Sequence, residues 1–141
     1  MKLAHVMTNK EKITYHADPL HLYQQLTHNA PHTLLLESAE IDSKDHLKSM
    51  VMTHGALMIR CDGYQLTFTA LTDNGEQLLK PIQVFFADAH SELRERTLTL
   101  TLAKESGILD EDARLKSISP LDGLRTLIKE IDCGKTLAFE D

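Results

Sequence analysis

The clearest candidate for chemistry is the pair Glu37-Ser38, which directly follows a compact apolar run at residues 33–36. The length of that run favours a buried strand over a helix. A strand end holds the groups that follow it in fixed positions, so the carboxylate would suit an ammonium group and the hydroxyl a polar partner. Lys48 could add a cation or lay its alkyl stem against a flat apolar ligand. Spacing alone favours a plainer interpretation, in which the pair begins a loop or caps the next element.

Eight histidines and the run Asp110-Glu111-Asp112 suggest a metal site, but their spacing does not support one. His28 and His32 are four residues apart, yet Pro31 between them interrupts any continuous helix face. Zinc sites usually draw at least three clustered ligands, and the other histidines are scattered along the chain. Consecutive acidic residues on a helix point about 100° apart, so a helix N-terminus explains the acidic run better than an ion does. We expect solvated histidines and no metal site.

The motifs of the common catalytic sites are absent from the sequence. It contains no G-x-x-x-x-G-K-[ST], G-x-G-x-x-G, G-x-S-x-G or H-E-x-x-H pattern. Cys61 and Cys133 lie far apart, so they suggest neither a disulfide framework nor a zinc-type cluster. We therefore assign no catalytic residue in this chain.

The composition is that of an ordinary globular protein, with 42% hydrophobic and 26% charged residues. The net charge of −6 argues against nucleic acid or an anionic membrane as a partner, because both attract basic patches. No apolar run approaches the ~20 residues that span a bilayer, and the first residues lack a signal-peptide core. We expect a cytoplasmic protein. Without repeats, low-complexity tracts or Gly/Ser linkers, residues 1–141 are expected to form a single domain.

Two helices are expected in the first half of the chain. Asp18-Pro19 supplies a capping residue and a proline at the first helical position, and the helix should end before Pro31. A second helix is predicted to start at the capping-box-like segment Asp42-Ser43-Lys44-Asp45. Its apolar stripe would be Leu47, Met50 and Val51.

Two further helices are expected in the second half. A short one opens at Asn74-Gly75-Glu76 and is ended or interrupted by Pro81. The other starts at Ser119-Pro120 and ends at Asp132-Cys133-Gly134-Lys135, with Gly134 near the usual C-terminal position. Its apolar residues form one stripe, made of Leu121, Leu124, Leu127, Ile128 and Ile131.

Strands are expected in three further places. Residues 2–15 should supply one or two short strands, and residues 97–102 alternate Thr with Leu as in a half-buried strand. A β-hairpin is predicted around Asp62-Gly63, since this dipeptide suits the two positive-φ positions of a type I′ turn. With these two residues at the centre of the turn, Cys61 lies opposite Tyr64, Ile59 opposite Leu66 and Leu57 opposite Phe68. This register puts the apolar side chains on one face, and a slip of one residue would mix apolar and polar side chains on both faces. The fold class is therefore α+β, with helices packed on an antiparallel or mixed sheet.

Four segments, in this order, resemble the amino-terminal part of anthranilate synthase component I. This family is the chorismate-using subunit of the first committed enzyme of tryptophan biosynthesis. The Leu-Leu-Glu-Ser run is the most specific feature, and it is shared more loosely with the aminodeoxychorismate synthase subunit. The segments are Pro31-His32-Thr33-Leu34-Leu35-Leu36-Glu37-Ser38-Ala39, Ile41-Asp42-Ser43-Lys44-Asp45 with Leu47-Lys48-Ser49, Asp110-Glu111-Asp112-Ala113-Arg114-Leu115, and residues 117–124.

The resemblance implies an effector site. In the family, the Leu-Leu-Glu-Ser run belongs to an allosteric pocket where L-tryptophan binds and inhibits the enzyme. Carried over residue by residue, the pocket would be lined by Leu36, Glu37, Ser38 and Lys48. Glu37 would take the ammonium group, and the indole would pack on Leu36 and on the Lys48 stem. The effector would then bridge two structural layers and bias their relative position.

The resemblance also implies the activity of a parent enzyme. That enzyme makes anthranilate from chorismate, with ammonia from a glutamine amidotransferase subunit and with Mg²⁺. The family's catalytic motifs, and the Asn-Pro-Ser-Pro-type segment that closes the tryptophan pocket, have no counterpart in these 141 residues. We therefore expect an amino-terminal regulatory domain or fragment that is inactive alone and that self-associates through exposed apolar surface. The alternatives are a stand-alone small-molecule-binding or assembly module, and the equivalent region of aminodeoxychorismate synthase.

Overall fold

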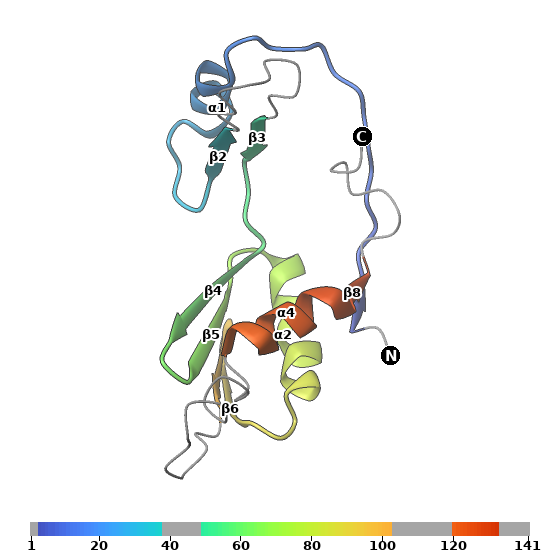
Figure 1. Cartoon of the computed structure of the whole chain (residues 1–141), viewed down its shortest axis with the longest axis vertical. Coiled ribbons are helices and arrows are strands. Elements are labelled where there is room, and N and C mark those ends of the chain that lie inside the picture. The colour runs from blue at the N-terminus through green and yellow to red at the C-terminus, as the bar shows by residue number, and fades with distance from the viewer. Residues whose placement is uncertain (1–2, 38–48, 103–119, 133–141) are drawn as a thin grey trace, which may run out of the picture. The chain divides into compact units, whose positions relative to one another are not determined.

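The computed structural model describes residues 3–37, 49–102 and 120–132 of the chain (Figure 1). Residue contacts divide the chain into two compact units, one formed by Glu11–Gly55 and the other by Met1–Lys10 together with Ala56–Asp141. The described elements combine helices with open antiparallel sheets, so the predicted α+β class is confirmed. The single domain stays a prediction. No helix in the described ranges is both long and apolar enough to cross a bilayer.

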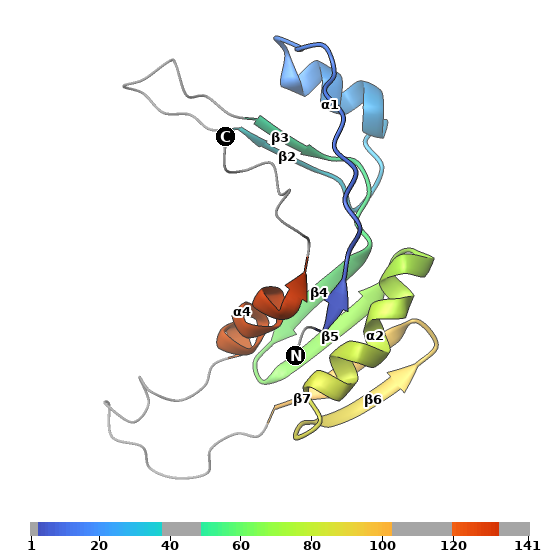
Figure 2. The ribbon, with the colours of Figure 1, turned by 90° about the vertical axis from the view of Figure 1, so that its right-hand side faces the viewer.

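The larger unit is built on a four-stranded antiparallel sheet with the strand order β4, β5, β7, β6 (Figure 2). These strands span Leu57–Asp62, Gln65–Ala70, Thr97–Thr101 and His90–Arg94, respectively. Along β5 and β7, leucines and one phenylalanine alternate with threonines, so one face is apolar and the other carries hydroxyls. The half-buried strand predicted at residues 97–102 is confirmed. Its buried cross-strand pairs are Leu66 with Leu100 and Phe68 with Leu98.

Two helices, α2 (Asp73–Phe85) and α4 (Pro120–Glu130), pack on the apolar face of this sheet (Figure 2). Leu79 and Ile82 of α2 and Leu127 of α4 are buried in the same core as Phe68. The prediction that Pro81 ends or interrupts the helix is wrong, because α2 continues through it to Phe85. A proline inside a helix costs about 3 kcal/mol. Burial of Ile82, the next residue, offsets part of that cost.

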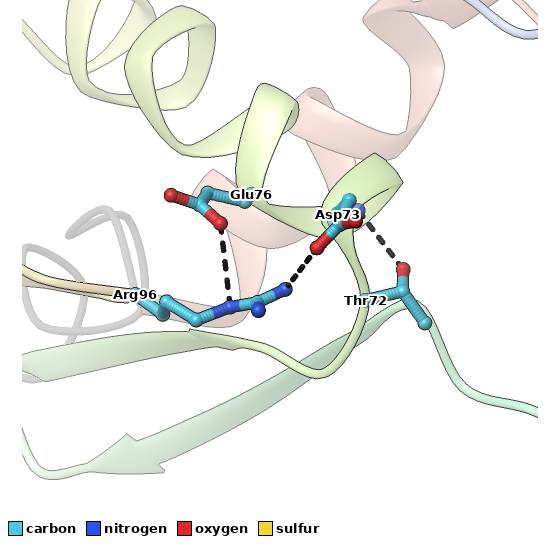
Figure 3. A network of polar contacts seen from close by, with 5 residues as sticks. Thr72, Asp73, Glu76 and Arg96 are labelled. Atoms are coloured by element: carbon cyan, nitrogen blue, oxygen red, sulfur yellow. Dashed lines mark hydrogen bonds and ion pairs between the residues drawn. The ribbon is translucent and has the colours of Figure 1, made fainter.

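The start of α2 is fixed by a capping threonine and by an arginine from the turn between β6 and β7 (Figure 3). The Thr72 hydroxyl accepts a hydrogen bond from the Gly75 N–H at 3.1 Å. The Arg96 guanidinium donates to the Asp73 carboxylate at 3.2 Å and lies 3.4 Å from a Glu76 carboxylate oxygen. Both carboxylates are also favoured by their place in the first helical turn. These exposed ion pairs orient the turn more than they stabilise the fold.

The hairpin between β4 and β5 is confirmed, but its predicted turn and register are wrong. Asp62 lies opposite Gln65, so the turn residues are Gly63 and Tyr64. Gly63 has φ of +56° and Tyr64 is not among the positive-φ residues, which fits a type II′ turn and not type I′. Cys61 therefore pairs with Leu66, two residues from the predicted partner. Because side chains alternate with a period of two, a shift of two residues preserves the sorting of faces on which the prediction rested.

Helix α4 begins at Pro120 as predicted, but its apolar stripe is only partly buried. Leu127 is buried, whereas Leu121 and Ile128 are 63% and 65% exposed, so the predicted stripe does not pack as a whole against the core. The helix also ends earlier than predicted, at Glu130. The next residues form β8 (Ile131–Asp132), which pairs in parallel with β1 (Ala4–His5). Strand β1 confirms a short strand within residues 2–15, and Gly134 lies outside the described residues.

The smaller unit contains α1 (Pro19–Thr27), β2 (Leu34–Glu37) and β3 (Ser49–Met52). Helix α1 begins as predicted, with the Asp18 carboxylate accepting a hydrogen bond from the His21 N–H at 2.9 Å. Strand β2 confirms the strand predicted at residues 33–36, but the prediction that it is buried is wrong, because Leu34 and Leu36 are exposed. The helix predicted to carry Met50 and Val51 is wrong for both, because in β3 they pair with Leu36 and Leu35 of β2. Its predicted start at residues 42–45 and the stripe residue Leu47 lie outside the described residues.

Gly75 lies close to the backbone of Ala56, which gives a first test of the fold. A Cβ atom there would lie 1.9 Å from the Ala56 carbonyl oxygen, which already accepts a hydrogen bond from the Leu71 N–H. We expect Gly75→Ala to lower the free energy of unfolding by about 1–3 kcal/mol, because backbone must move to relieve the overlap. Urea unfolding followed by circular dichroism measures this change.

Gly123→Ala is the matched control for that experiment. A Cβ atom at Gly123 meets only the Phe86 ring, 3.3 Å away, and a side chain can shift. Alanine also gains up to about 1 kcal/mol over glycine within a helix, so this variant should be neutral or more stable. Equal unfolding midpoints for the two variants would contradict the backbone contact at Gly75.

Candidate functional site

The paired strands β2 and β3, which we call the β2–β3 ribbon, place the predicted site residue Glu37 at a strand end. Leu34 pairs with Met52 at one end of the ribbon, and Glu37 pairs with Ser49 at the other. Glu37 is exposed, so its carboxylate is accessible. The other predicted residues, Ser38 and Lys48, lie outside the described residues. The structure thus fixes the backbone of Glu37 through an antiparallel pair and confirms that the apolar strand runs directly into it.

The two faces of the ribbon carry different side chains. Residues directly opposite each other in an antiparallel pair point to the same face. Leu35 and Val51, both half-buried, therefore share a face with the last pair, Glu37 and Ser49. Leu36 lies on the opposite face, where four large apolar side chains are 37–48% exposed, namely Leu34, Leu36, Met50 and Met52. The two described site residues, Leu36 and Glu37, thus point away from each other across the strand.

A cavity of about 350 Å³ lies on the Glu37 face of the ribbon. Ser49 and Val51 of β3 line one side of it, and Pro19 and Leu22 of α1 line another. The irregular segment before α1 completes the lining with aliphatic, hydroxyl, phenol and imidazole groups, from Ile13, Thr14, Tyr15 and His16. The cavity can therefore receive an apolar group with polar contacts at its margin.

A chain of side-chain hydrogen bonds connects α1 to the beginning of β2. The Thr33 hydroxyl donates to the Ala30 carbonyl at 2.8 Å, so at 2.7 Å the Tyr23 hydroxyl donates to Thr33. The buried Thr27 hydroxyl donates to the Tyr23 carbonyl at 2.8 Å and accepts from the Asn29 N–H at 3.2 Å. These bonds hold a tight connection in which His28, Asn29 and His32 have positive φ. They fix where β2 starts, and its pairing with β3 extends to Glu37.

Other polar groups of the described residues do not assemble a comparable site. No three His, Cys, Asp or Glu side chains lie together within the described ranges, and Asp110-Glu111-Asp112 falls outside them. A second depression, of about 640 Å³, lies on the hydroxyl face of the larger sheet. Its charged residues include Glu92 and Arg94, which form an ion pair with each other. It offers no apolar wall to a ligand, since its other lining residues are Glu95, Thr97 and Thr99.

Sequence reasoning did not identify the residues that line the cavity on the ribbon. The capping-box-like start at residues 42–45 predicts a helix that includes Val51, and residues 49–52 lack the alternation of apolar and polar positions that would indicate a strand. The segment at residues 13–16 has no regular structure and no motif, so nothing in the sequence singles it out. The capped helix start at Asp18-Pro19 was the one available signal, since it fixes Pro19 and Leu22 on the first turn of α1.

Known proteins resemble most of this chain, although no family model matches it. A protein named anthranilate synthase component 1, from Vibrio parahaemolyticus, is 38% identical over 132 residues, which cover 93% of this chain and 24% of the relative. The protein of that name from Escherichia coli K12 is 44% identical over 80% of this chain and 22% of its own length. Its counterpart from Citrobacter freundii is 40% identical over 80% of this chain and 76% of its own length. The chain therefore spans about a quarter of the first two relatives.

The hydrogen bond between Tyr23 and Thr33 gives a test of what positions the ribbon. We expect Tyr23→Phe to destabilise the smaller unit by about 1 kcal/mol, since it removes one part-buried hydrogen bond. Amide hydrogen exchange in β2 and β3 should then be about fivefold faster. Tyr15→Phe is the control, because the Tyr15 side chain is 87% exposed. If both variants left exchange in the ribbon unchanged, the hydroxyl contact would have no part in holding β2.

Proposed function

Because the chain belongs to the anthranilate synthase component 1 family, we propose that it forms the amino-terminal, effector-binding part of that enzyme. The complete enzyme would make anthranilate from chorismate, with ammonia delivered by a glutamine amidotransferase that serves as its component 2. The observation that carries this proposal is the 40% identity to a relative of which the chain covers 76%. The effector would be L-tryptophan, the end product of the pathway that this reaction begins.

The proposed effector site lies at the end of the β2–β3 ribbon where Glu37 pairs with Ser49. Glu37 would accept hydrogen bonds from the ammonium group, and charge-assisted bonds of this kind contribute about 1.5–3 kcal/mol. Ser38 directly follows Glu37 in the sequence, and Lys48 directly precedes Ser49. Each is therefore the sequence neighbour of one member of this last pair. Ser38 would supply a hydroxyl, and the Lys48 stem would pack on the indole.

The opposite facing of Leu36 and Glu37 restricts where such a ligand can bind. A ligand that lay flat on either face of the ribbon could contact only one of these two side chains. A ligand seated beyond the last pair, across the strand ends, can reach Glu37 from one side and Leu36 from the other. We therefore place L-tryptophan across the end of the ribbon. The cavity on the Glu37 face, with Ser49 at its margin, adjoins that position.

The Mg²⁺ of the complete enzyme needs carboxylate ligands that this chain does not gather within its described residues. No group of three acidic, histidine or cysteine side chains occurs there, so these residues do not fit the ion. No catalytic step is assigned to them. The role proposed for the chain is regulatory.

The first test concerns catalysis by the chain alone. We expect no anthranilate from chorismate, ammonia and Mg²⁺, because the chain spans 24% of the Vibrio parahaemolyticus relative and carries none of the common catalytic motifs. Anthranilate fluorescence measures the product directly. The complete Escherichia coli relative serves as the positive control. Detectable turnover by residues 1–141 would overturn the assignment of a purely regulatory role.

The second test concerns inhibition by tryptophan. In a complete enzyme that carries residues 1–141 in place of the matching region of the Escherichia coli relative, Glu37→Gln should raise the half-inhibitory tryptophan concentration at least about tenfold. Loss of one charge-assisted hydrogen bond to the ammonium group accounts for this factor. Ser38→Ala should act in the same direction. The rate without tryptophan, measured in the same assay, should stay close to that of the unsubstituted enzyme.

Glu92→Gln is the matched control for the inhibition test. Glu92 is also an exposed carboxylate on a strand, but it belongs to the larger unit. Its substitution should leave inhibition unchanged. If Glu37→Gln behaved like this control, Glu37 would not bind the effector, and the family assignment would still hold.

A further inference from the structure

The outer edge of β4 has backbone groups without a strand partner among the described residues. Strand β4 is at the end of the sheet order and pairs only with β5 (Figure 2). The Ala70 N–H donates to the Arg96 carbonyl at 2.8 Å, so Ala70 directs its backbone groups toward β7 and away from its β4 partner, Leu57. The backbone of Leu57 must then point outward, and by alternation so must that of Ile59 and Cys61. Each presents one N–H and one C=O to the edge.

The side chains of the same three residues continue the apolar face of the sheet. Ile59 lies opposite Phe68 on the helix-covered face, yet Ile59 is 42% exposed while Phe68 is fully buried. Leu57 and Cys61 share that face, opposite Ala70 and Leu66. The hydrophobic core therefore extends to this edge, where the described residues leave Ile59 partly exposed. An apolar strand edge of this kind is a template for pairing with another strand.

The other edge of the sheet, β6, differs in its side chains. Both edge strands carry two charged residues on the face away from the helices, Arg60 and Asp62 in β4 and Glu92 and Arg94 in β6. On the helix-covered face, however, β6 has the polar Ser91 beside Leu93, whereas that face of β4 carries no polar side chain apart from the Cys61 thiol. Helix α2 also reaches over it, since the Gln83 side chain donates to the Ser91 hydroxyl at 3.0 Å. Pairing between copies is therefore favoured at β4 and not at β6.

We propose that β4 pairs antiparallel with β4 of a second copy of this chain, with Ile59 opposite Ile59 of the second copy. This register places Leu57 opposite Cys61 of the second copy, so all three outward-facing residues exchange backbone hydrogen bonds in both directions. It also closes on itself by a two-fold axis, as homodimer interfaces do. Shifting the centre to Arg60 would set two guanidinium groups directly opposite each other, which disfavours that register. In the register centred on Ile59, Arg60 lies opposite Met58 of the second copy.

The oligomeric state of the full 141-residue chain tests this proposal. Sedimentation equilibrium should show a dimer whose dissociation constant rises at least about tenfold in Ile59→Lys, because a charge on the core-side face of the edge opposes pairing. Leu93→Lys is the matched control, since Leu93 is 38% exposed on the same face of the β6 edge. It should leave the constant unchanged. A monomer at all concentrations, or equal effects of both variants, overturns the proposal. Circular dichroism confirms that each variant is folded.

A disulfide tests the register directly. In a Cys61→Ser, Cys133→Ser background, Ile59→Cys would bring two Cα atoms to about 5.5 Å, the spacing of a hydrogen-bonded pair, which suits a disulfide. Mild oxidation should then give a covalent dimer. Leu93→Cys in the same background is the control and should stay monomeric. Equal cross-linking of the two variants would rule out pairing centred on Ile59, and a dimer that persists in Ile59→Lys would place the contact elsewhere.

Discussion

Strand β5 is hydrogen-bonded to a strand on each side, and its side chains are buried on one face. The rest of the larger unit is arranged to satisfy these backbone groups and to cover these side chains. The β5 backbone alternates between β4 and β7, so each of its residues is committed to one neighbour. Its inward side chains, Leu66 and Phe68, are fully buried. The facing positions of β7 must therefore be apolar, and they are Leu100 and Leu98. Helices α2 and α4 add the second layer that these side chains need to leave water.

The sequence determined faces more securely than partners. Alternation of apolar residues predicted which side of the β4–β5 hairpin is buried, but the same pattern is compatible with two registers that differ by two residues. The structure has Cys61 opposite Leu66 and not Tyr64, because the turn residues are Gly63 and Tyr64 and not Asp62 and Gly63. For Pro81, local chemistry predicted a helix end, whereas burial of Ile82 favours continuing the helix. The β4–β5 register and the continuation of α2 through Pro81 both depend on contacts between different elements. The pattern of residues within one segment does not predict such contacts.

The same limit applies to the candidate site. An apolar run that ends in Glu37 could be recognised as a strand end, because its length and its boundaries are local features. The pairing of Glu37 with Ser49 could not, because residues 49–52 read equally well as one turn of a helix. Leu36 illustrates the consequence. Resemblance groups it with Glu37 in one pocket, and the alternation of a strand then restricts a shared ligand to the strand end.

The parallel pair of β1 with β8 has a consequence for the order of folding. It joins Ala4 to Ile131, so it closes a loop of almost the whole chain, and the smaller unit lies within that loop in sequence. Closing a long loop costs chain entropy, and only the contacts formed after closure compensate for that cost. Such a pair therefore forms late in folding. During synthesis, Glu11–Gly55 can complete its own short-range contacts while β1 still lacks its partner. The first strand of the chain is thus among the last to be secured.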